Sequence, residues 1–174
     1  QRRAFLLASV AMLSLVGGPA LALQAGNAGA ARKRNIRLAG ARAPIEILEE
    51  QLGIPHIRAQ SKHDAFFGQG YVVARDRLFQ IDLAQRRDLG RMAESFGPRF
   101  VSADRAARLF QYRGDIDAEL AALPPDVLDC ARGFVAGVNA RIAELEADPT
   151  QLPLEYGILG ITPLRWDVRD FVRV

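Results

Sequence analysis

Residues 66–97 have the sequence FFGQGYVVARDRLFQIDLAQRRDLGRMAESFG, and we expect the rest of the chain to pack around them. Apolar side chains recur there at steps of four, three, four and three residues, at Phe67, Tyr71, Ala74, Leu78 and Ile81. This spacing places them on one face of a long helix and is typical of a buried scaffold helix. The charged residues are predicted to lie largely off that face, at Arg75, Asp76, Arg86, Arg87 and Asp88. The pattern indicates core packing and by itself predicts no chemistry.

Local signals predict where this helix begins and ends. Ser61 and Asp64 have the spacing of a capping box, so Ser61 is expected to cap the helix start. Gly90 is the predicted stop, and a short helix over residues 91–96 should then end at Gly97-Pro98.

Two glycines inside the predicted helix need a structural reason. Gly68 and Gly70 each lower helix stability by about 1 kcal/mol relative to alanine, so we expect another chain segment or a ligand to approach the backbone closely here. At Gly70 we expect another segment of the chain. They do not form a phosphate-binding loop, because no Gly-Lys-Ser/Thr follows them. Val73 stands where a dinucleotide fingerprint would have its third glycine.

Four segments resemble, in order and spacing, the early part of the α subunit of penicillin acylases. They are GIPHI at 53–57, GQGYVVARDRLFQI with the following Arg86, Arg87 and LGR at 68–91, GFVAGVN at 133–139, and TPLRW at 162–166. The resemblance covers residues 44–174. It implies an α+β fold in which this chain is a mostly helical part of the α subunit with a β-hairpin. In the complete protein this part would belong to the αββα sandwich of the N-terminal-nucleophile hydrolases.

The same resemblance implies a penicillin amidase-type acylase, a hydrolase acting on carbon–nitrogen bonds of linear amides. Such an enzyme would be made as a zymogen and would remove an acyl group from β-lactam antibiotics or similar N-acyl compounds after autoproteolytic maturation. Its implied partners are a β subunit from the same precursor and a small-molecule N-acyl substrate. Two residues depart from the family pattern: Val168 stands where a proline often follows the tryptophan motif, and Arg75 stands where glutamine is common. These departures leave the subfamily undetermined. The preferred acyl group is therefore left open between arylacetyl, glutaryl-like and fatty acyl.

Enzymes of this family use a serine at the N-terminus of the β subunit, whose own α-amine serves as the base. The pKa of an α-amine, about 7.7–8.0, suits that role. Precursor cleavage after a glycine exposes the nucleophile, yet none of the 15 glycines precedes Ser, Thr or Cys, and no Gly-x-Ser-x-Gly motif occurs. We therefore assign no catalytic residue and no metal ligand to this chain, and leave substrate-binding residues unknown. A calcium ion is implied only for the complete enzyme.

Several residues that could suggest chemistry have simpler structural explanations. His56 and His63 are seven residues apart, which does not fit a zincin motif, and His56 is expected to be a hydrogen-bonded structural residue. The serines Ser61, Ser95 and Ser102 are expected to be helix caps or surface residues. Tyr71 and Phe67 are candidates for supporting a substrate pocket from behind.

Composition and charge narrow the function classes further. The chain is 49% hydrophobic and 25% charged, an ordinary globular composition. Its net charge of +3 hides an asymmetry, because residues 1–43 carry seven basic and no acidic residues, whereas residues 44–174 carry 16 basic and 20 acidic ones. The globular part is thus mildly acidic, which argues against nucleic-acid binding. Cys130 is the single cysteine, so it can form neither an internal disulfide nor a cysteine-based zinc site, and we expect it to be buried.

The N-terminal residues resemble an export signal. Residues 1–25 combine Arg2-Arg3, a short apolar stretch and a small-residue site at 20–22, which predicts a signal peptide and no stable membrane anchor. The paired arginines also fit a twin-arginine signal, and we leave the two export routes open. Residues 26–43 are predicted to be a flexible leader. A periplasmic or secreted location follows, and the absence of an initiator Met together with the apolar end suggests a chain truncated at both ends.

The remaining elements follow from turn signals and periodicity. A β-hairpin is predicted from residues 45–47 and 55–59, and helices from about 103–111, 116–123 and 125–146. The last helix should turn an apolar face to the core, formed by Val127, Ala131, Phe134, Val138, Ile142 and Leu145. Residues 152–161 are predicted to be an apolar loop, and Trp166 to precede another helix. The alternative function is a non-catalytic secreted helical module that binds a partner.

Overall fold

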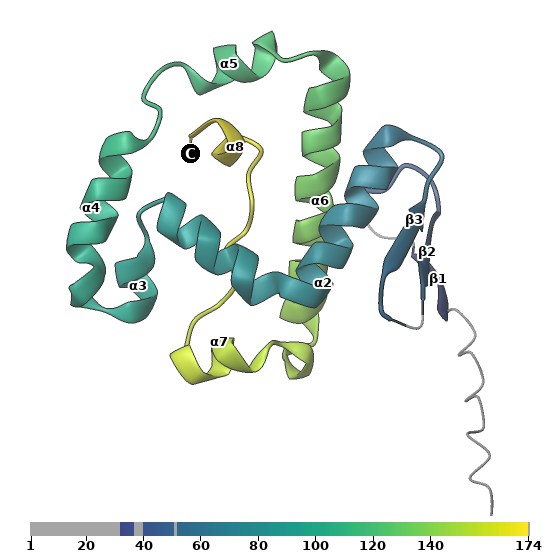
Figure 1. Cartoon of the computed structure of the whole chain (residues 1–174), viewed down its shortest axis with the longest axis horizontal. Coiled ribbons are helices and arrows are strands. Elements are labelled where there is room, and N and C mark those ends of the chain that lie inside the picture. The colour runs from purple at the N-terminus through teal and green to yellow at the C-terminus, as the bar shows by residue number, and fades with distance from the viewer. Residues whose placement is uncertain (1–31, 37–39, 51, 174) are drawn as a thin grey trace, which may run out of the picture. The chain divides into compact units, whose positions relative to one another are not determined.

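The computed structural model describes residues 32–36, 40–50 and 52–173 (Figure 1). The predicted signal peptide, residues 1–25, lies outside these ranges. The long helices are α2 (Lys62–Asp88) and α6 (Pro125–Ala147). The shorter elements are β1 (Arg32–Ile36), β2 (Ile45–Glu49), β3 (Pro55–Arg58), α3 (Met92–Phe96), η1 (Pro98–Phe100), α4 (Val101–Phe110), α5 (Ile116–Ala122), η2 (Pro149–Gln151), α7 (Leu154–Leu159) and α8 (Asp170–Arg173).

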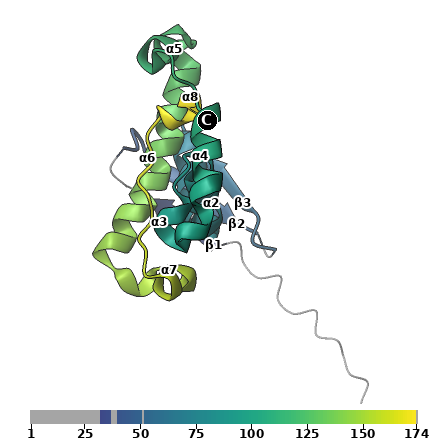
Figure 2. The ribbon, with the colours of Figure 1, turned by 90° about the vertical axis from the view of Figure 1, so that its left-hand side faces the viewer.

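The sheet has three antiparallel strands in the order β1-β2-β3 and lies beside the first half of α2 (Figures 1 and 2). The predicted hairpin is confirmed as β2 and β3, with Ile47 opposite Ile57. The flexible leader expected over residues 26–43 is wrong in part, because residues 32–36 form β1 and pair with β2 from Arg32↔Glu49 to Ile36↔Ile45. The segment lacks apolar alternation, so the open edge of β2, not the intrinsic pattern of β1, accounts for this strand.

Helix α2 begins and ends as its sequence predicts. The backbone N–H of Asp64 donates to Ser61 Oγ (3.1 Å), and Ser61 Oγ donates to Asp64 Oδ2 (2.7 Å). The helix ends at Asp88, and Gly90 follows with a φ of 64°. The backbone of Arg77 is non-helical (φ −140°, ψ 28°), so α2 is kinked there.

The predicted apolar stripe of α2 is buried from Phe67 to Leu78, and Ile81 is half-buried. Among the charged residues expected to lie largely off that face, Arg86 is nevertheless buried, at only 4% exposed. It lies beside Asp82, which is 1% exposed and one helical turn earlier, and the two side chains form a buried ion pair. Pairing is the usual way in which such charges are tolerated inside a protein.

Glycines allow α2 and α6 to cross at very short range. A methyl group on Gly70 would lie 2.1 Å from the carbonyl oxygen of Phe134, and one on Gly137 would lie 2.0 Å from that of Phe67. On Gly133 it would lie 2.5 Å from the carbonyl oxygen of His63. The backbone approach expected at Gly70 is therefore confirmed, and the approaching segment is α6.

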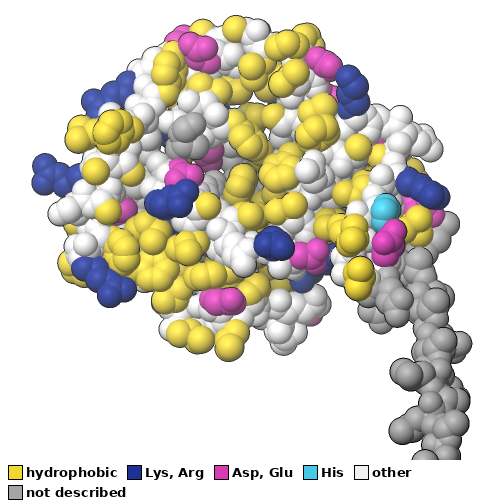
Figure 3. Space-filling view, viewed as in Figure 1, with side chains coloured by type: hydrophobic (Ala, Val, Ile, Leu, Met, Phe, Trp, Pro, Cys, Tyr) yellow, Lys and Arg dark blue, Asp and Glu magenta, His cyan; other side chains and the backbone are white. Residues whose placement is uncertain are grey.

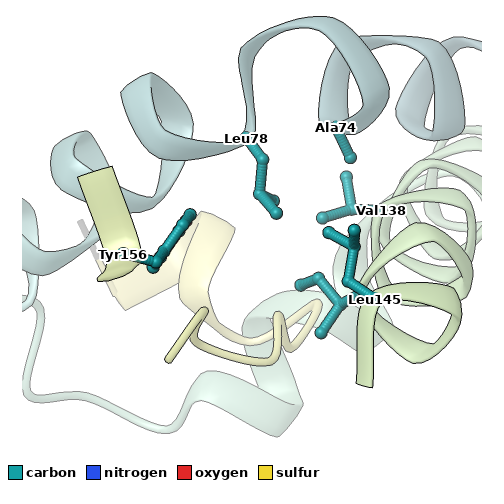
Figure 4. Packing of buried hydrophobic residues seen from close by; sticks show 6 residues of the cluster. Ala74, Leu78, Val138, Leu145 and Tyr156 are labelled. Atoms are coloured by element: carbon teal, nitrogen blue, oxygen red, sulfur yellow. The ribbon is translucent and has the colours of Figure 1, made fainter. Parts of the chain in front are cut away.

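Two apolar clusters form the core on either side of this crossing. One joins β2 to the first half of α2 through Ile45, Ile47, Phe67, Tyr71 and Val72. The other joins α2, α6 and α7 through Ala74, Leu78, Val138, Ile142, Leu145 and Tyr156 (Figure 4). Phe79 packs edge-on against the Tyr156 ring with centroids 5.5 Å apart, which extends the second cluster.

Other predicted elements are confirmed within a few residues, with two corrections. Helices α3 to α6 occur where expected. The apolar loop expected over residues 152–161 is wrong, because Leu154–Leu159 form α7, which ends at the left-handed Gly160 (φ 63°). The prediction that α6 faces the core throughout is also wrong, since Val127 is 48% exposed and Ala131 and Phe134 are only half-buried. The buried residues of α6 begin at Gly133, although Lys62 and His63 of α2 already contact Asp126 and Asp129.

Candidate functional site

The uncovered start of α6 borders an apolar groove with a volume of about 670 Å³. We call it the α6 groove, and its apolar lining comes from Phe66, Val127, Cys130, Ala131, Phe134 and Phe171. Lys62, Gln69 and Asp126 form its polar rim, where Lys62 Nζ lies 3.0 Å from Asp126 Oδ2. In the space-filling view, apolar side chains gather in the middle of the visible face (Figure 3). An apolar concavity with a few polar groups at its edge is the usual form of a binding site.

Cys130 lies in this groove and is partly exposed, which corrects the expectation that it is buried. Like Val127, Cys130 precedes Gly133, the first buried residue of α6, and faces the groove between α6 and residues Lys62, Phe66 and Gln69 of α2. The cysteine is therefore accessible from the groove.

Two aromatic rings that line the groove, those of Phe134 and Phe171, also pack against Trp166. Phe134, Trp166 and Phe171 are in mutual contact, with ring centroids 6.2–6.3 Å apart and inclined geometries. Such edge-on arrangements are favourable beyond the apolar area that they bury. Phe134 and Phe171 also line the groove, so its shape depends on how Trp166 is held.

Trp166 belongs to an extended segment, residues 162–166, which we call the strap. Buried side chains of α2 bind its start: Arg86 Nη2 donates to the Thr162 carbonyl oxygen (2.6 Å), and the Leu164 N–H donates to Asp82 Oδ1 (3.1 Å). Asn139 of α6 binds its end, donating to the Trp166 carbonyl oxygen (2.8 Å) and accepting from the Trp166 N–H (2.9 Å). The strap is thus fixed to both long helices.

The Asp82–Arg86 pair is itself satisfied on several sides. Arg86 Nε donates to Asp82 Oδ2 (3.1 Å), and Arg86 Nη1 donates to Ser95 Oγ (2.9 Å). Burial, together with the charge of Asp82, raises the pKa of Tyr156, so its phenol stays neutral. These contacts rigidify the second half of α2 and the strap.

A second polar cluster holds the chain before β2 to both long helices. His63 Nε2 lies 3.1 Å from the Gly40 carbonyl oxygen, and its Nδ1 lies 3.1 Å from the Asp129 carbonyl oxygen. Burial alone would raise the pKa of Asp64, but hydrogen bonds from the Arg42 N–H (2.8 Å), Ser61 and the Ala43 N–H lower it below its ordinary value. The hydrogen-bonded Arg42 guanidinium lowers the pKa of Asp129.

The residues singled out in the sequence do not come together as a site. Phe67 is buried between α2 and the sheet, and the Tyr71 hydroxyl donates to Glu144 Oε2 (2.9 Å). Their role as pocket supports stays a prediction. His56 Nε2 lies 2.6 Å from Glu50 Oε1 at the surface, Ser95 accepts from Arg86, and Ser102 is exposed on α4.

The described ranges contain no group of three His, Cys, Asp or Glu side chains that could hold a metal ion. No helix in those ranges is long and apolar enough to cross a bilayer.

The sequence analysis singled out the segments that contain the strap, Arg86 and Asn139, but it did not predict that they bind one another. Asp82 and Arg86 have the i, i+4 spacing of an ion pair, which was the available signal, but such pairs are usually exposed. Nothing in the sequence pattern indicates that Asn139 binds the backbone of Trp166, because the two residues are 27 positions apart.

Comparison with known proteins identifies the family to which this chain is similar. Residues 44–174 match the penicillin amidase family. Over 131 residues, 75% of this chain, the sequence is 38% identical to penicillin G acylase of Escherichia coli, and it is 38% identical over 133 residues, 76% of this chain, to penicillin acylase 2 proenzyme of Pseudomonas sp. SE83. An acyl-homoserine lactone acylase QuiP of Pseudomonas fluorescens is 29% identical over 133 residues.

The chain spans only 16–17% of the length of these relatives. Among solved structures, a thermostable penicillin G acylase from Alcaligenes faecalis superposes with a TM-score of 0.69 at 34% identity. The match covers 74% of this chain and 68% of that one, and it confirms the predicted α+β class. Both the family match and the superposition lead to one conclusion: this chain belongs to the penicillin amidase family.

Proposed function

We propose that residues 44–174 are the N-terminal portion of the α subunit of an exported acylase. The complete enzyme would hydrolyse the carbon–nitrogen bond of linear amides and remove the acyl group from β-lactam antibiotics or similar N-acyl compounds. The single observation that carries this proposal is the ordered match of residues 44–174 to a family whose relatives are named as penicillin and acyl-homoserine lactone acylases.

The described residues have a structural part in this proposal. The glycine-lined crossing and the strap supply rigid support, whereas nucleophile, base and oxyanion donors would come from a β subunit released from the same precursor. A relative named as a proenzyme supports such processing. The proposal includes a calcium ion in the complete enzyme, bound by residues outside the described ranges, and a periplasmic or secreted location reached through the signal peptide of residues 1–25.

The test is to express the full reading frame that contains this sequence and to assay acyl release from three amides. An arylacetyl amide, a glutaryl amide and a long-chain acyl homoserine lactone cover the acyl groups left open. We expect precursor cleavage after a glycine that precedes Ser, Thr or Cys, and hydrolysis of at least one amide. Replacing that nucleophile with alanine should abolish both. Intact, inactive protein from the unaltered frame would contradict the proposal.

The exposed α6 groove favours a second candidate, a non-catalytic secreted module that binds a partner through this apolar surface. The reading frame separates the two candidates, because only the enzyme requires a processing site downstream. A frame without one would favour the module.

A further inference from the structure

The α6 groove is already formed in this structure, because contacts with other parts of the fold fix the position of its α6 wall and of its α8 wall. The α6 wall is fixed by the close crossing with α2 at Gly70, Gly133 and Gly137. The α8 wall is fixed by Trp166, which packs on Phe171 and is bound at its backbone by Asn139. A groove with such supports does not need to reorganise when something binds in it.

Large apolar side chains at the groove are open to solvent in this chain. Phe171 and Val127 are each 48% exposed, and Phe66 is also exposed. Exposed apolar patches of this kind usually mark an interaction surface. The groove volume of about 670 Å³ suits several side chains of one inserted segment. A stable dimer of two copies would instead need about 800 Å² of surface from each partner.

We propose that the α6 groove is the docking site for an apolar, aromatic-bearing segment from the remainder of the acylase polypeptide. The relatives support this occupant, because more than four-fifths of their length has no counterpart among the matched residues. The inference rests on the proposed function only in its choice of that occupant. The Lys62–Asp126 ion pair at the rim presents one charge of each sign, which suits a segment whose ends are polar.

Cys130 provides a direct probe of occupancy, since it lines the groove and is the single cysteine in this sequence. The experiment uses the full-length protein and measures the rate at which a maleimide labels Cys130, identified by peptide mass spectrometry. The same protein unfolded in urea gives the reference rate. Labelling reports whether the groove is covered, independently of amidase activity.

Two valines form a matched pair for the mutational test. Val127 in the groove is 48% exposed, and Val101 at the start of α4 is 47% exposed and outside the groove. Val127→Lys would place a charge against the docked segment, whereas Val101→Lys makes the same change at equal exposure. Thermal unfolding of both variants checks that the fold is kept.

We expect Cys130 of the full-length protein to be labelled at least about tenfold more slowly than in urea, independently of protein concentration. Val127→Lys should raise the rate about tenfold, as burying a lysine against apolar groups displaces the segment, and Val101→Lys should leave it unchanged. Fast labelling of the unaltered protein, or equal effects of both variants, would overturn the proposal. Protection that grows with protein concentration would also overturn it, because a second copy would then fill the groove.

Activity measured on the same samples separates this inference from the proposed function. A protein without amidase activity in which Cys130 is still protected would support docking and count against the acylase. An active acylase in which Cys130 is labelled freely would support the proposed function and count against docking in the groove.

Discussion

At the scale of single residues, the structure explains side chains that the sequence leaves ambiguous. Gly70 has no room for a methyl group, since the position that it would occupy lies 2.1 Å from a backbone oxygen of α6. Backbone cannot rotate away as a side chain can. The absence of a side chain is therefore what lets the two long helices meet.

We expect Gly70→Ala to destabilise the protein by about 1–3 kcal/mol, because overpacking outweighs the gain in helix propensity. Urea unfolding of the full-length protein measures the difference. Gly157→Ala in α7 is the matched control, because nothing lies within 4 Å of the added methyl group. That variant should gain up to about 1 kcal/mol. A stabilising Gly70→Ala would show that α6 does not press on α2 at this point.

Asp64 should make stability depend on pH in the acid range. The pKa of Asp64 is lowered in the folded protein, so its carboxylate contributes stability above the unfolded pKa of about 3.9. That contribution is lost as the pH falls through the lower, folded pKa. We expect the free energy of unfolding to fall below about pH 4, and to fall less steeply in Asp64→Asn. Glu155→Gln, at an exposed position, controls for the loss of one negative charge. Equal slopes in all three proteins would exclude this role.

At the scale of elements, the sequence predicts what local chemistry determines and fails where distant partners decide. The α2 cap, its glycine stop and the β2–β3 hairpin follow from short-range signals that the structure confirms. Strand β1 was missed because its strand character comes from the edge of β2. Helix α7 was missed because its six residues contain Gly157 and follow Pro153, both typical of loops.

The candidate site was less predictable than the fold for the same reason. The groove lies where the start of α6, the start of α2 and α8 meet without filling the space between them, and the periodicity of either long helix does not encode how closely they approach there. The apolar pattern of α6 continues unbroken from its covered to its uncovered part.

The strap should depend on its buried ion pair. Arg86→Ala leaves the Asp82 carboxylate buried without its charge partner and should destabilise the protein by about 3–5 kcal/mol. The double substitution Asp82→Leu with Arg86→Met removes both charges and should cost markedly less. Urea unfolding of the three proteins compares them. Equal losses in the single and double variants would mean that hydrogen bonds to the strap, rather than the charge pair, dominate.

At the scale of the whole molecule, several large apolar side chains of the described residues are exposed outside the α6 groove. Phe110 is 90% exposed, and Leu109, Leu154 and Ile158 are each at least 70% exposed. These side chains lie on α4 and α7, apart from the α6 groove. Such surface favours association.

We therefore expect residues 44–174, expressed alone, to be poorly soluble and inactive. Residues 32–174 should associate less, because β1 then covers the edge of β2, which the shorter chain leaves open. Sedimentation at several concentrations compares the two. A monodisperse, cooperatively unfolding monomer from the shorter chain would contradict the prediction.

The contact between α2 and α6 can form only after α6 has been synthesised, well after α2. His63 and Asp129, which meet beside it, are 66 residues apart in the chain. A ribosome adding about 5–20 residues per second takes roughly 3–13 s to cover that interval. During this time Ala74 and Leu78 lack their packing partners Val138 and Ile142, which have not yet been synthesised. Strands β2 and β3 precede α2 in the chain, so they can already cover Phe67 and Tyr71. During synthesis the apolar face of α2 is therefore covered by the sheet near its start but exposed near its end. A chaperone that binds exposed apolar segments would bind there.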